Sequence, residues 1–284
     1  MRLAPYIAAL VAALAVGGVA GQTTTKRAAN TETVSSELTD VKFIAGLFWA
    51  SATGLHRRCA ATIITNNTLV TSAACAMSDY PTAAYGAGEW RIIAGDTDDR
   101  YLETAGSDQK GFSVANIDID KCANFAVIQL SDEMYIGSEI QSIVLSSHPL
   151  EAGIQLFTYN TSNPTGTPFL SLSLGGTDAC EMHLPGYTDD YFICTQPVQN
   201  QMVAGDYLGG DPIIGFSNQQ QAGAIVALVG VTGRYYSTLV DAQNGKINDP
   251  AAYRFSPMVA PHIDKIAKYA GVEPTSIITT GSLF

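Results

Sequence analysis

Short apolar runs recur along most of the chain and set its predicted architecture. They span four to nine residues, are rich in β-branched and aromatic side chains, and are separated by turn residues, which is the pattern of strands. The predicted strands are residues 42–50, 59–65, 69–72, 89–94, 125–130, 155–159, 191–194, 212–216 and 224–232. The pattern therefore predicts an all-β fold.

Two local patterns interrupt the strands. Asn66 and Asn67 stand between two of them and predict a tight hairpin, because Asn tolerates the left-handed backbone that such turns demand. Residues 258–270 carry apolar side chains at spacings of three and four and end before Gly271, which predicts a helix packed on the strands. We interpret His262, on this helix, as a surface or capping group.

The ends of the chain differ from its middle. Residues 1–20 combine Arg2, a run of Ala, Leu and Val, and small residues before Gly21, which is the pattern of a secretory signal peptide. Residues 21–41 read as a flexible lead-in, and its Lys26-Arg27 pair is either a processing site or two solvated charges. We expect a secreted, extracellular protein with a domain over residues 42–270 and a C-terminal tail over residues 271–284.

Composition narrows the possible partners. The 284 residues hold 15 Lys and Arg against 26 Asp and Glu, a net charge of −11, and this argues against nucleic acid as a partner, because phosphate binding needs clustered basic residues. Hydrophobic residues make up 46%, enough for a packed core. No segment after the signal is long and apolar enough for a membrane anchor. No metal or nucleotide motif is present in the sequence, so we expect no cofactor and no metal.

Five cysteines follow the signal, and an oxidising destination predicts disulfides. Their spacings favour Cys59 with Cys75 and Cys180 with Cys194, although the sequence leaves other pairings open. Cys122 is then either a buried small apolar side chain, which we favour, or an intermolecular disulfide donor. Two sequons, at Asn66 and Asn160, predict N-glycosylation on exposed turns.

The segment between the first two cysteines, CAATIITNNTLVTSAAC, resembles C-G-G-(S/T)-L-I-x-x-x-x-V-L-T-A-A-H-C of the trypsin- and chymotrypsin-like serine proteases. Residues 124–130, 191–194 and 205–212 are similar to the family's D-I-A-L-I-x-L, M-(I/F/L)-C-A and G-D-S-G-G-P. The resemblance covers residues 42–270. It implies two six-stranded antiparallel β-barrels with a C-terminal α-helix, and it supports the two favoured disulfides.

At the positions that the resemblance identifies as catalytic, this sequence has residues that differ from the family's histidine, aspartate and serine. Ala74 stands at the histidine position, Asn124 at the aspartate position, and Tyr207 at the serine position, or Leu208 if the gap is placed differently. Acyl transfer needs a nucleophile, a base and a group that orients the base. A methyl group, an amide and a phenol with a pKa of about 10 do not supply them, so we expect no catalytic residue.

These departures imply a homologue that acts by binding. The expected surface lies around the former cleft and includes Tyr207, Gln201, Tyr235 and Tyr236, because tyrosines supply rigid contact area at interfaces. The other interpretation of Tyr235 and Tyr236 is ordinary strand residues. The expected partner is an extracellular protein, a host hydrolase being one candidate, as for the secreted glucanase-inhibitor proteins of oomycetes. The alternative function is a trypsin-like endopeptidase or hydrolase with weak or relocated activity.

Overall fold

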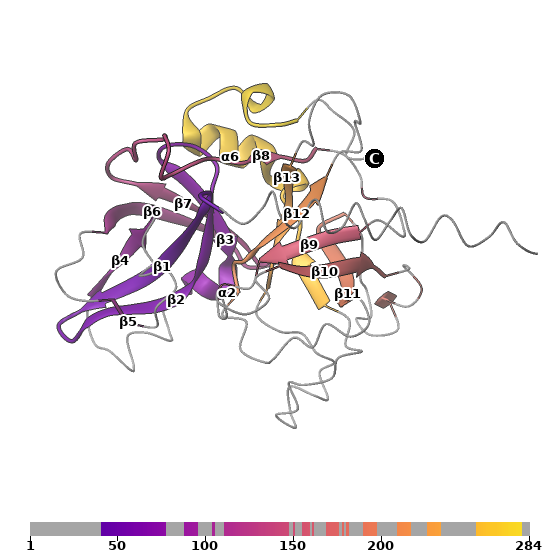
Figure 1. The fold of residues 1–284 in the computed structure, drawn as a ribbon, viewed down its shortest axis with the longest axis horizontal. Coiled ribbons are helices and arrows are strands. Elements are labelled where there is room, and N and C mark those ends of the chain that lie inside the picture. Colours follow the sequence, from indigo (N-terminus) through magenta and orange to yellow (C-terminus); the bar gives the residue numbers. More distant parts are fainter. Residues whose placement is uncertain are drawn as a thin grey trace, which may run out of the picture. The chain divides into compact units, whose positions relative to one another are not determined.

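The described part of the chain is built mainly of two seven-stranded sheets, and the all-β class is confirmed (Figure 1). The structure is a computed structural model. It describes residues 41–77, 88–95, 104–105, 111–147, 150, 155–159, 161, 169–175, 178, 180–181, 190–197, 209–216, 226–233 and 254–279. Strands early in the chain, indigo to magenta, form one sheet, and later strands, pink to yellow, form the other.

The first sheet closes into a barrel. Its strands are β1 (Ile44–Ser51), β2 (Gly54–Ile63), β3 (Thr68–Ser72), β4 (Gly88–Ile93), β5 (Thr104–Ala105), β6 (Phe112–Asp120) and β7 (Phe125–Leu130). They follow the order β1-β4-β6-β7-β3-β2-β5, and β1 also pairs with β2. Six antiparallel strands therefore form a ring, and β5 extends it at β2. Alternate side chains fill the interior, among them Leu47, Ile63, Leu69 and Ile128.

The second sheet stays open, which corrects the prediction of a second closed barrel. Its strands are β8 (Val144–Leu145), β9 (Gln155–Tyr159), β10 (Phe169–Leu174), β11 (Phe192–Pro197), β12 (Pro212–Phe216), β13 (Val226–Val231) and β14 (Arg254–Pro257). The order is β14-β11-β10-β9-β12-β13-β8, with β8 parallel to β13. Among the described residues, the only pairing recorded between these two edges is the isolated bridge of Gly230, in β13, with Met258, directly after β14. Pro257 has no N–H to continue a ladder there.

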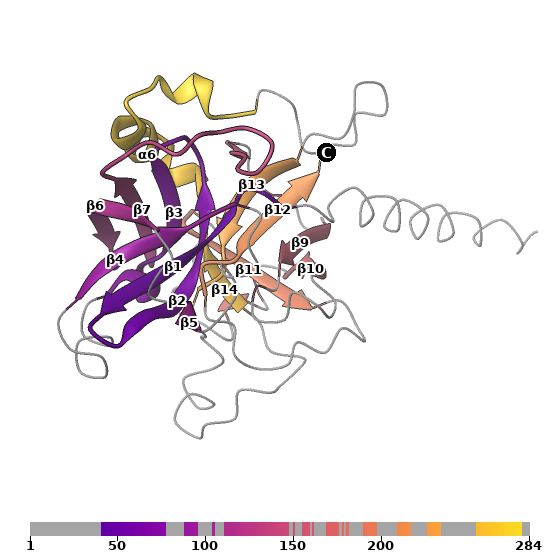
Figure 2. The same cartoon turned by 60° about the vertical axis from the view of Figure 1, so that its left-hand side comes forward.

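The two sheets meet along neighbouring strands. β13 contacts β3, and the two strands lie near each other in both ribbon views (Figure 2). The one-turn helix α2 (Ala73–Ala76) follows β3 directly. The end of the first barrel that carries α2 therefore faces the second sheet.

The predicted C-terminal helix is confirmed, but it begins later than expected. A 3-10 turn occupies Ala260–His262, and the helix α6 spans Ile263–Ala270 before Gly271, whose left-handed φ of 69° ends it. Pro261 suits the tight first turn, because it has no N–H to donate. A second 3-10 turn follows at Pro274–Ser276. Within the described residues no helix has the length and apolar character needed to span a membrane.

One face of α6 is fixed to the first barrel by polar contacts. The Tyr269 hydroxyl donates to Asp118 at 2.8 Å, and the Lys265 ammonium lies 3.2 Å from the same carboxylate. Gln129 donates to the carbonyl of Tyr269 at 3.3 Å. Burial raises the pKa of Asp118, but the hydrogen bonds from Tyr269 and Lys265 outweigh it and hold that pKa below its ordinary value.

The predicted hairpin between β2 and β3 is present for a different reason than expected. The Asn67 side-chain oxygen accepts hydrogen bonds from the hydroxyls of Thr65 and Thr68, each at 3.0 Å. Among the described residues, the only non-glycine residue with positive φ is Asn124, at 51°. The turn therefore uses Asn67 as a side-chain acceptor, and neither asparagine adopts the left-handed backbone.

Both favoured disulfides are confirmed. Cys59 pairs with Cys75 across 16 residues, and Cys180 pairs with Cys194 across 14. Cys122 is free and exposed, in the turn between β6 and β7. The favoured interpretation of a buried Cys122 was therefore wrong, because this turn projects the thiol into solvent instead of into a core.

Candidate functional site

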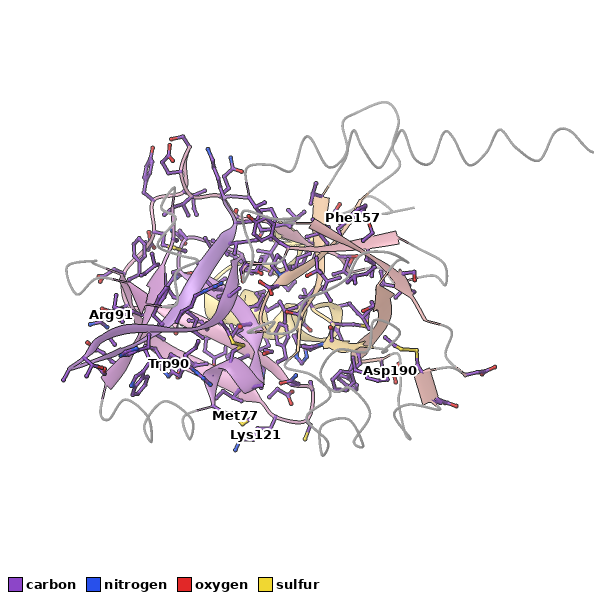
Figure 3. All side chains as sticks on the ribbon, turned by 60° about the horizontal axis from the view of Figure 1, so that its bottom comes forward. Met77, Trp90, Arg91, Lys121, Phe157 and Asp190 are labelled. Atoms are coloured by element: carbon purple, nitrogen blue, oxygen red, sulfur yellow. A yellow bond between two sulfur atoms is a disulfide. The ribbon has the colours of Figure 1, made fainter. Side chains whose placement is uncertain are left out.

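Two of the three positions expected to have lost their catalytic groups, Ala74 and Asn124, lie in contact. The backbone N–H of Ala74, in α2, donates to the side-chain oxygen of Asn124 at 3.1 Å, and the N–H of Ala73 donates to the Asn124 carbonyl at 3.0 Å. Asn124 is buried in the turn that leads into β7. Figure 3 labels Met77, just after α2, and Lys121, in the same turn as Asn124, at one end of the barrel.

Gly233, two residues after the end of β13, completes this junction. Gly233 lies so close to Asn124 that a Cβ on it would stand 2.9 Å from the amide nitrogen of Asn124 and 3.2 Å from the Phe255 carbonyl. A side chain at position 233 would therefore displace the amide. Residues of the first barrel and of the second sheet meet here, and Asn124 is the polar group between them.

The chemistry available at this junction is limited by the two side chains. The Ala74 methyl group has no polar atom, and an amide such as that of Asn124 neither gains nor loses a proton near neutral pH. The Asn124 oxygen is already an acceptor for α2. The Asn124 side chain therefore positions the backbone of α2, and neither side chain has a group that transfers a proton near neutral pH.

A pair of glycines connects the two sheets next to this junction. Gly209 and Gly210 both have positive φ, 88° and 77°. The Gly209 carbonyl accepts from the N–H of Ala60 at 3.1 Å, and the N–H of Gly210 donates to the Thr232 carbonyl at 2.7 Å. A Cβ on Gly210 would lie only 2.0 Å from the carbonyl oxygen of Ala60, so no other residue fits at that position.

Asp211, the next residue, is fully buried between the sheets. Its Oδ1 accepts from the hydroxyl and the N–H of Thr161, and its own N–H donates to the Thr232 hydroxyl at 2.9 Å. Arg57, on β2, donates from Nη1 to the Thr161 carbonyl at 3.1 Å. Asp211 Oδ2 has no hydrogen-bond partner among the described residues. Asp211, Thr161 and Arg57 form the cluster that we call the inter-sheet clasp.

Burial dominates the electrostatics of the clasp. It raises the pKa of Asp211 to about 6, although the Thr161 hydroxyl, the Arg57 charge and the Thr161 N–H act in the opposite direction. The carboxyl group therefore faces the protein interior and takes part in holding the two sheets together. No pattern in the sequence indicates the contact of Asp211 with Thr161.

His262 is also buried, which corrects its interpretation as a surface group. Its ring stacks on Phe125 with centroids 4.2 Å apart and planes 3° from parallel. Burial holds the pKa of His262 below its ordinary value; Asp120 partly offsets this and Lys265 adds to it. Its Nε2 has no hydrogen-bond partner within the described part of the chain. The helical pattern could not show this, because His262 precedes α6 and follows the geometry of the 3-10 turn.

The remaining predicted site residues are only partly placed. Tyr207, Gln201, Tyr235, Tyr236 and Asn160, the acceptor residue of the second sequon, lie outside the described residues. Asn66 is half-buried, and its carbonyl accepts from the N–H of Met134 at 2.6 Å, so its glycosylation stays a prediction. In the described part of the chain, no three His, Cys, Asp or Glu side chains are grouped closely enough to hold a metal ion.

Comparison with known proteins agrees with this architecture. A family model described as Trypsin matches residues 31–237, more than half of the chain. Two solved structures of kallikrein-related peptidase 10, one of them a complex with Zn²⁺, are similar to this chain. Each match covers 82% of this chain and 97% of the kallikrein-related chain. Their TM-scores are 0.56 and 0.57 at 13% and 14% identity, so the likeness is one of fold. No curated protein matches the chain.

Proposed function

Since this chain belongs to the trypsin family, we propose that it is a secreted homologue without protease activity and that it acts by binding an extracellular protein. The family fold is retained in the closed first barrel, the C-terminal helix and both disulfides. What is altered, in our proposal, is the chemistry at the junction between the sheets.

The contact of Ala74 with Asn124 carries the proposal. A serine nucleophile of this family needs a base beside it and a carboxylate that holds the base in one tautomer. The pair that meets at the end of the first barrel offers a methyl group and an amide whose oxygen is already bonded to the α2 backbone. This supports the absence of a proton acceptor at the position where acyl transfer would need one.

Secretion is the second part of the proposal. The signal-like residues 1–20 support it, and the two disulfides are compatible with an oxidising compartment. An extracellular partner follows from that location. A hydrolase is one candidate partner, as for inhibitory members of this fold, and the chain would then act as its inhibitor.

A hydrolase with a relocated centre is the alternative, and one contact favours it. Thr53 Oγ1 lies 2.8 Å from His56 Nε2 on the hairpin between β1 and β2, which places a base within reach of a hydroxyl. The same oxygen also lies 2.8 Å from Ser51 Oγ, and the turn is exposed. Open water around this hydroxyl weakens any stabilisation of a developing oxyanion, so we rank this function second.

Peptide cleavage separates the two functions. The purified mature chain is incubated with a random-sequence peptide pool, with active trypsin as positive control, and products are identified by mass spectrometry. We expect no product from this chain. Cleavage that persists after separation from contaminants contradicts the proposal, and its loss in Thr53→Ala and His56→Ala would assign the activity to the hairpin. The binding half is tested by affinity capture from extracellular fluid, followed by titration with the purified candidate partner.

A further inference from the structure

The segment between β7 and β8 holds large apolar side chains out in water. Tyr135 is 86% exposed and its neighbour Ile136 is 37% exposed, although both lie within a few residues of the buried Leu130 and Met134. Tyr135 is the most exposed large hydrophobic side chain among the described residues. We call residues 131–142 the Tyr135 loop.

Backbone hydrogen bonds fix the loop at both ends. The N–H groups of Ser131, Met134 and Gln141 donate to the carbonyls of Ser113, Asn66 and Lys42, at 2.9, 2.6 and 3.0 Å. Within the loop, the N–H of Gly137 donates to the Ile140 carbonyl at 2.8 Å. The side chain of Met134 is buried in the barrel core and anchors the loop from inside. A partner would therefore meet backbone that is already ordered, and less entropy is lost on binding.

The Tyr135 ring rests on the next turn of the loop. A Cβ built on Gly137 would stand 2.7 Å from a ring carbon of Tyr135, so the ring covers the bare glycine backbone. The aromatic side chain thus has a support that limits its rotamers while most of its surface stays exposed. Exposed aromatic anchors with a fixed position are typical of the centres of protein interfaces.

The charged side chains of the loop itself have one sign, and the neighbouring cation is Lys42, whose carbonyl accepts from Gln141. Residues 131–142 contain Asp132, Glu133 and Glu139 and no Lys, Arg or His, and all three acidic residues are exposed. A partner surface that receives Tyr135 must therefore sit among negative charges. A surface with Lys or Arg around an apolar pocket is complementary to it, whereas an acidic surface is repelled.

We infer that the Tyr135 loop is the surface through which this chain binds its protein partner, and that the partner presents a basic surface surrounding an apolar pocket that takes the Tyr135 ring. The inference rests on the proposed binding function and places that function away from the α2 junction. Tyr135 and Ile136 supply the contact area, and the negative charges of Asp132, Glu133 and Glu139 favour a partner surface of positive charge.

The test uses the immobilised full chain and a random-sequence peptide display library as probe. Enriched peptides are synthesised and titrated against four proteins: the unaltered chain, Tyr135→Ala, Gly137→Ala and Tyr191→Ala. The last is the matched control, because Tyr191 is also an exposed tyrosine, at 48%, and lies directly before β11 of the second sheet. Gly137→Ala keeps every charge and the tyrosine itself, but it displaces the ring. Circular dichroism confirms that each variant folds.

We expect peptides rich in Lys or Arg with at least one large apolar residue. Binding to Tyr135→Ala should be about thirtyfold weaker, which is the size of a hot-spot loss. Gly137→Ala should weaken it as well, Tyr191→Ala should leave it unchanged, and high salt should weaken binding to the unaltered chain.

Three outcomes overturn the inference. Peptides that bind the unaltered chain and both loop variants equally place the binding surface elsewhere and leave the proposed function standing. Enrichment of acidic peptides at the loop contradicts the predicted partner chemistry. A library with no enriched peptide also overturns the inference, and the proposed function is then decided by its own cleavage and capture experiments.

Discussion

Replacing Asp211 by Asn should stabilise the protein near neutral pH. The carboxyl group is fully buried, and burial raises its pKa from 3.8 to about 6. The unfolded chain releases this proton at lower pH than the folded chain does. The folded state therefore binds more protons between about pH 4 and about pH 6, and the free energy of unfolding falls as pH rises through that window. Asn cannot ionise, and its side-chain oxygen can still accept from Thr161.

The magnitude follows from the shift itself. A change of about 2 pKa units corresponds to about 3 kcal/mol, and full burial leaves no solvent to screen it. Asp211→Asn should thus match the unaltered chain at about pH 4 and exceed it by up to about 3 kcal/mol at about pH 7. The new amide hydrogens face the side of Asp211 Oδ2, near the positive Arg57, so the observed gain should lie below that limit.

Urea unfolding at a series of pH values, followed by circular dichroism with the disulfides intact, measures the effect. Asp190→Asn, at an exposed position, is the matched control and corrects for the general loss of one negative charge. The reasoning is refuted if Asp211→Asn is less stable than the unaltered chain at about pH 7 and its deficit grows with pH. In that case the ionised carboxylate stabilises the fold through Arg57, and burial does not set its protonation.

Three further predictions concern other buried or exposed groups. His262→Phe keeps an aromatic ring on Phe125 but removes a buried base whose pKa is lowered. Because that lowered pKa reduces the stability of the folded state as pH falls below about 6.5, the melting temperature of the variant should fall less on acidification than that of the unaltered chain. An equal fall in both proteins would contradict this. Gly210→Ala should lower the free energy of unfolding by at least about 3 kcal/mol or prevent folding. Gly271 also has a positive φ but has open space around its Cβ, so Gly271→Ala should lower that free energy by about 1 kcal/mol. Equal melting temperatures for the two variants would refute the clash at Gly210. Ellman's reagent should react with the native protein at Cys122 and leave Cys122→Ser unlabelled; labelling of that variant would show an open disulfide.

Much of the fold could be predicted because strand patterns are local. Three predicted strands, over residues 125–130, 155–159 and 212–216, have the bounds of β7, β9 and β12. The strands missed include β6, whose FSVANIDID sequence mixes apolar positions with Asp and Asn, and β10, whose FLSLSL sequence alternates and could have been recognised. Closure of a sheet depends on residues far apart in sequence, and the absent N–H of Pro257 at the open edge gives no signal by itself.

The candidate site was predictable only where a motif carried it. The resemblance brought Ala74 and Asn124 to attention, and the structure places them in contact. The inter-sheet clasp was not foreseen, because it joins Arg57, Thr161 and Asp211 from distant segments. A signal existed in the charged Arg57 within an otherwise buried strand, since a buried charge requires a polar partner. Exposure of Tyr135 is likewise a property of the folded loop and not of its sequence.

Absence of an activated nucleophile is the central claim, and intact-mass detection of fluorophosphonate labelling tests it most directly. The purified chain is exposed to the reagent with active trypsin alongside, and the folded chain is compared with heat-denatured protein. We predict no adduct on the folded chain under conditions that label trypsin completely. A stoichiometric adduct on the folded chain would contradict the account, and peptide mapping would then identify the nucleophile that it overlooks.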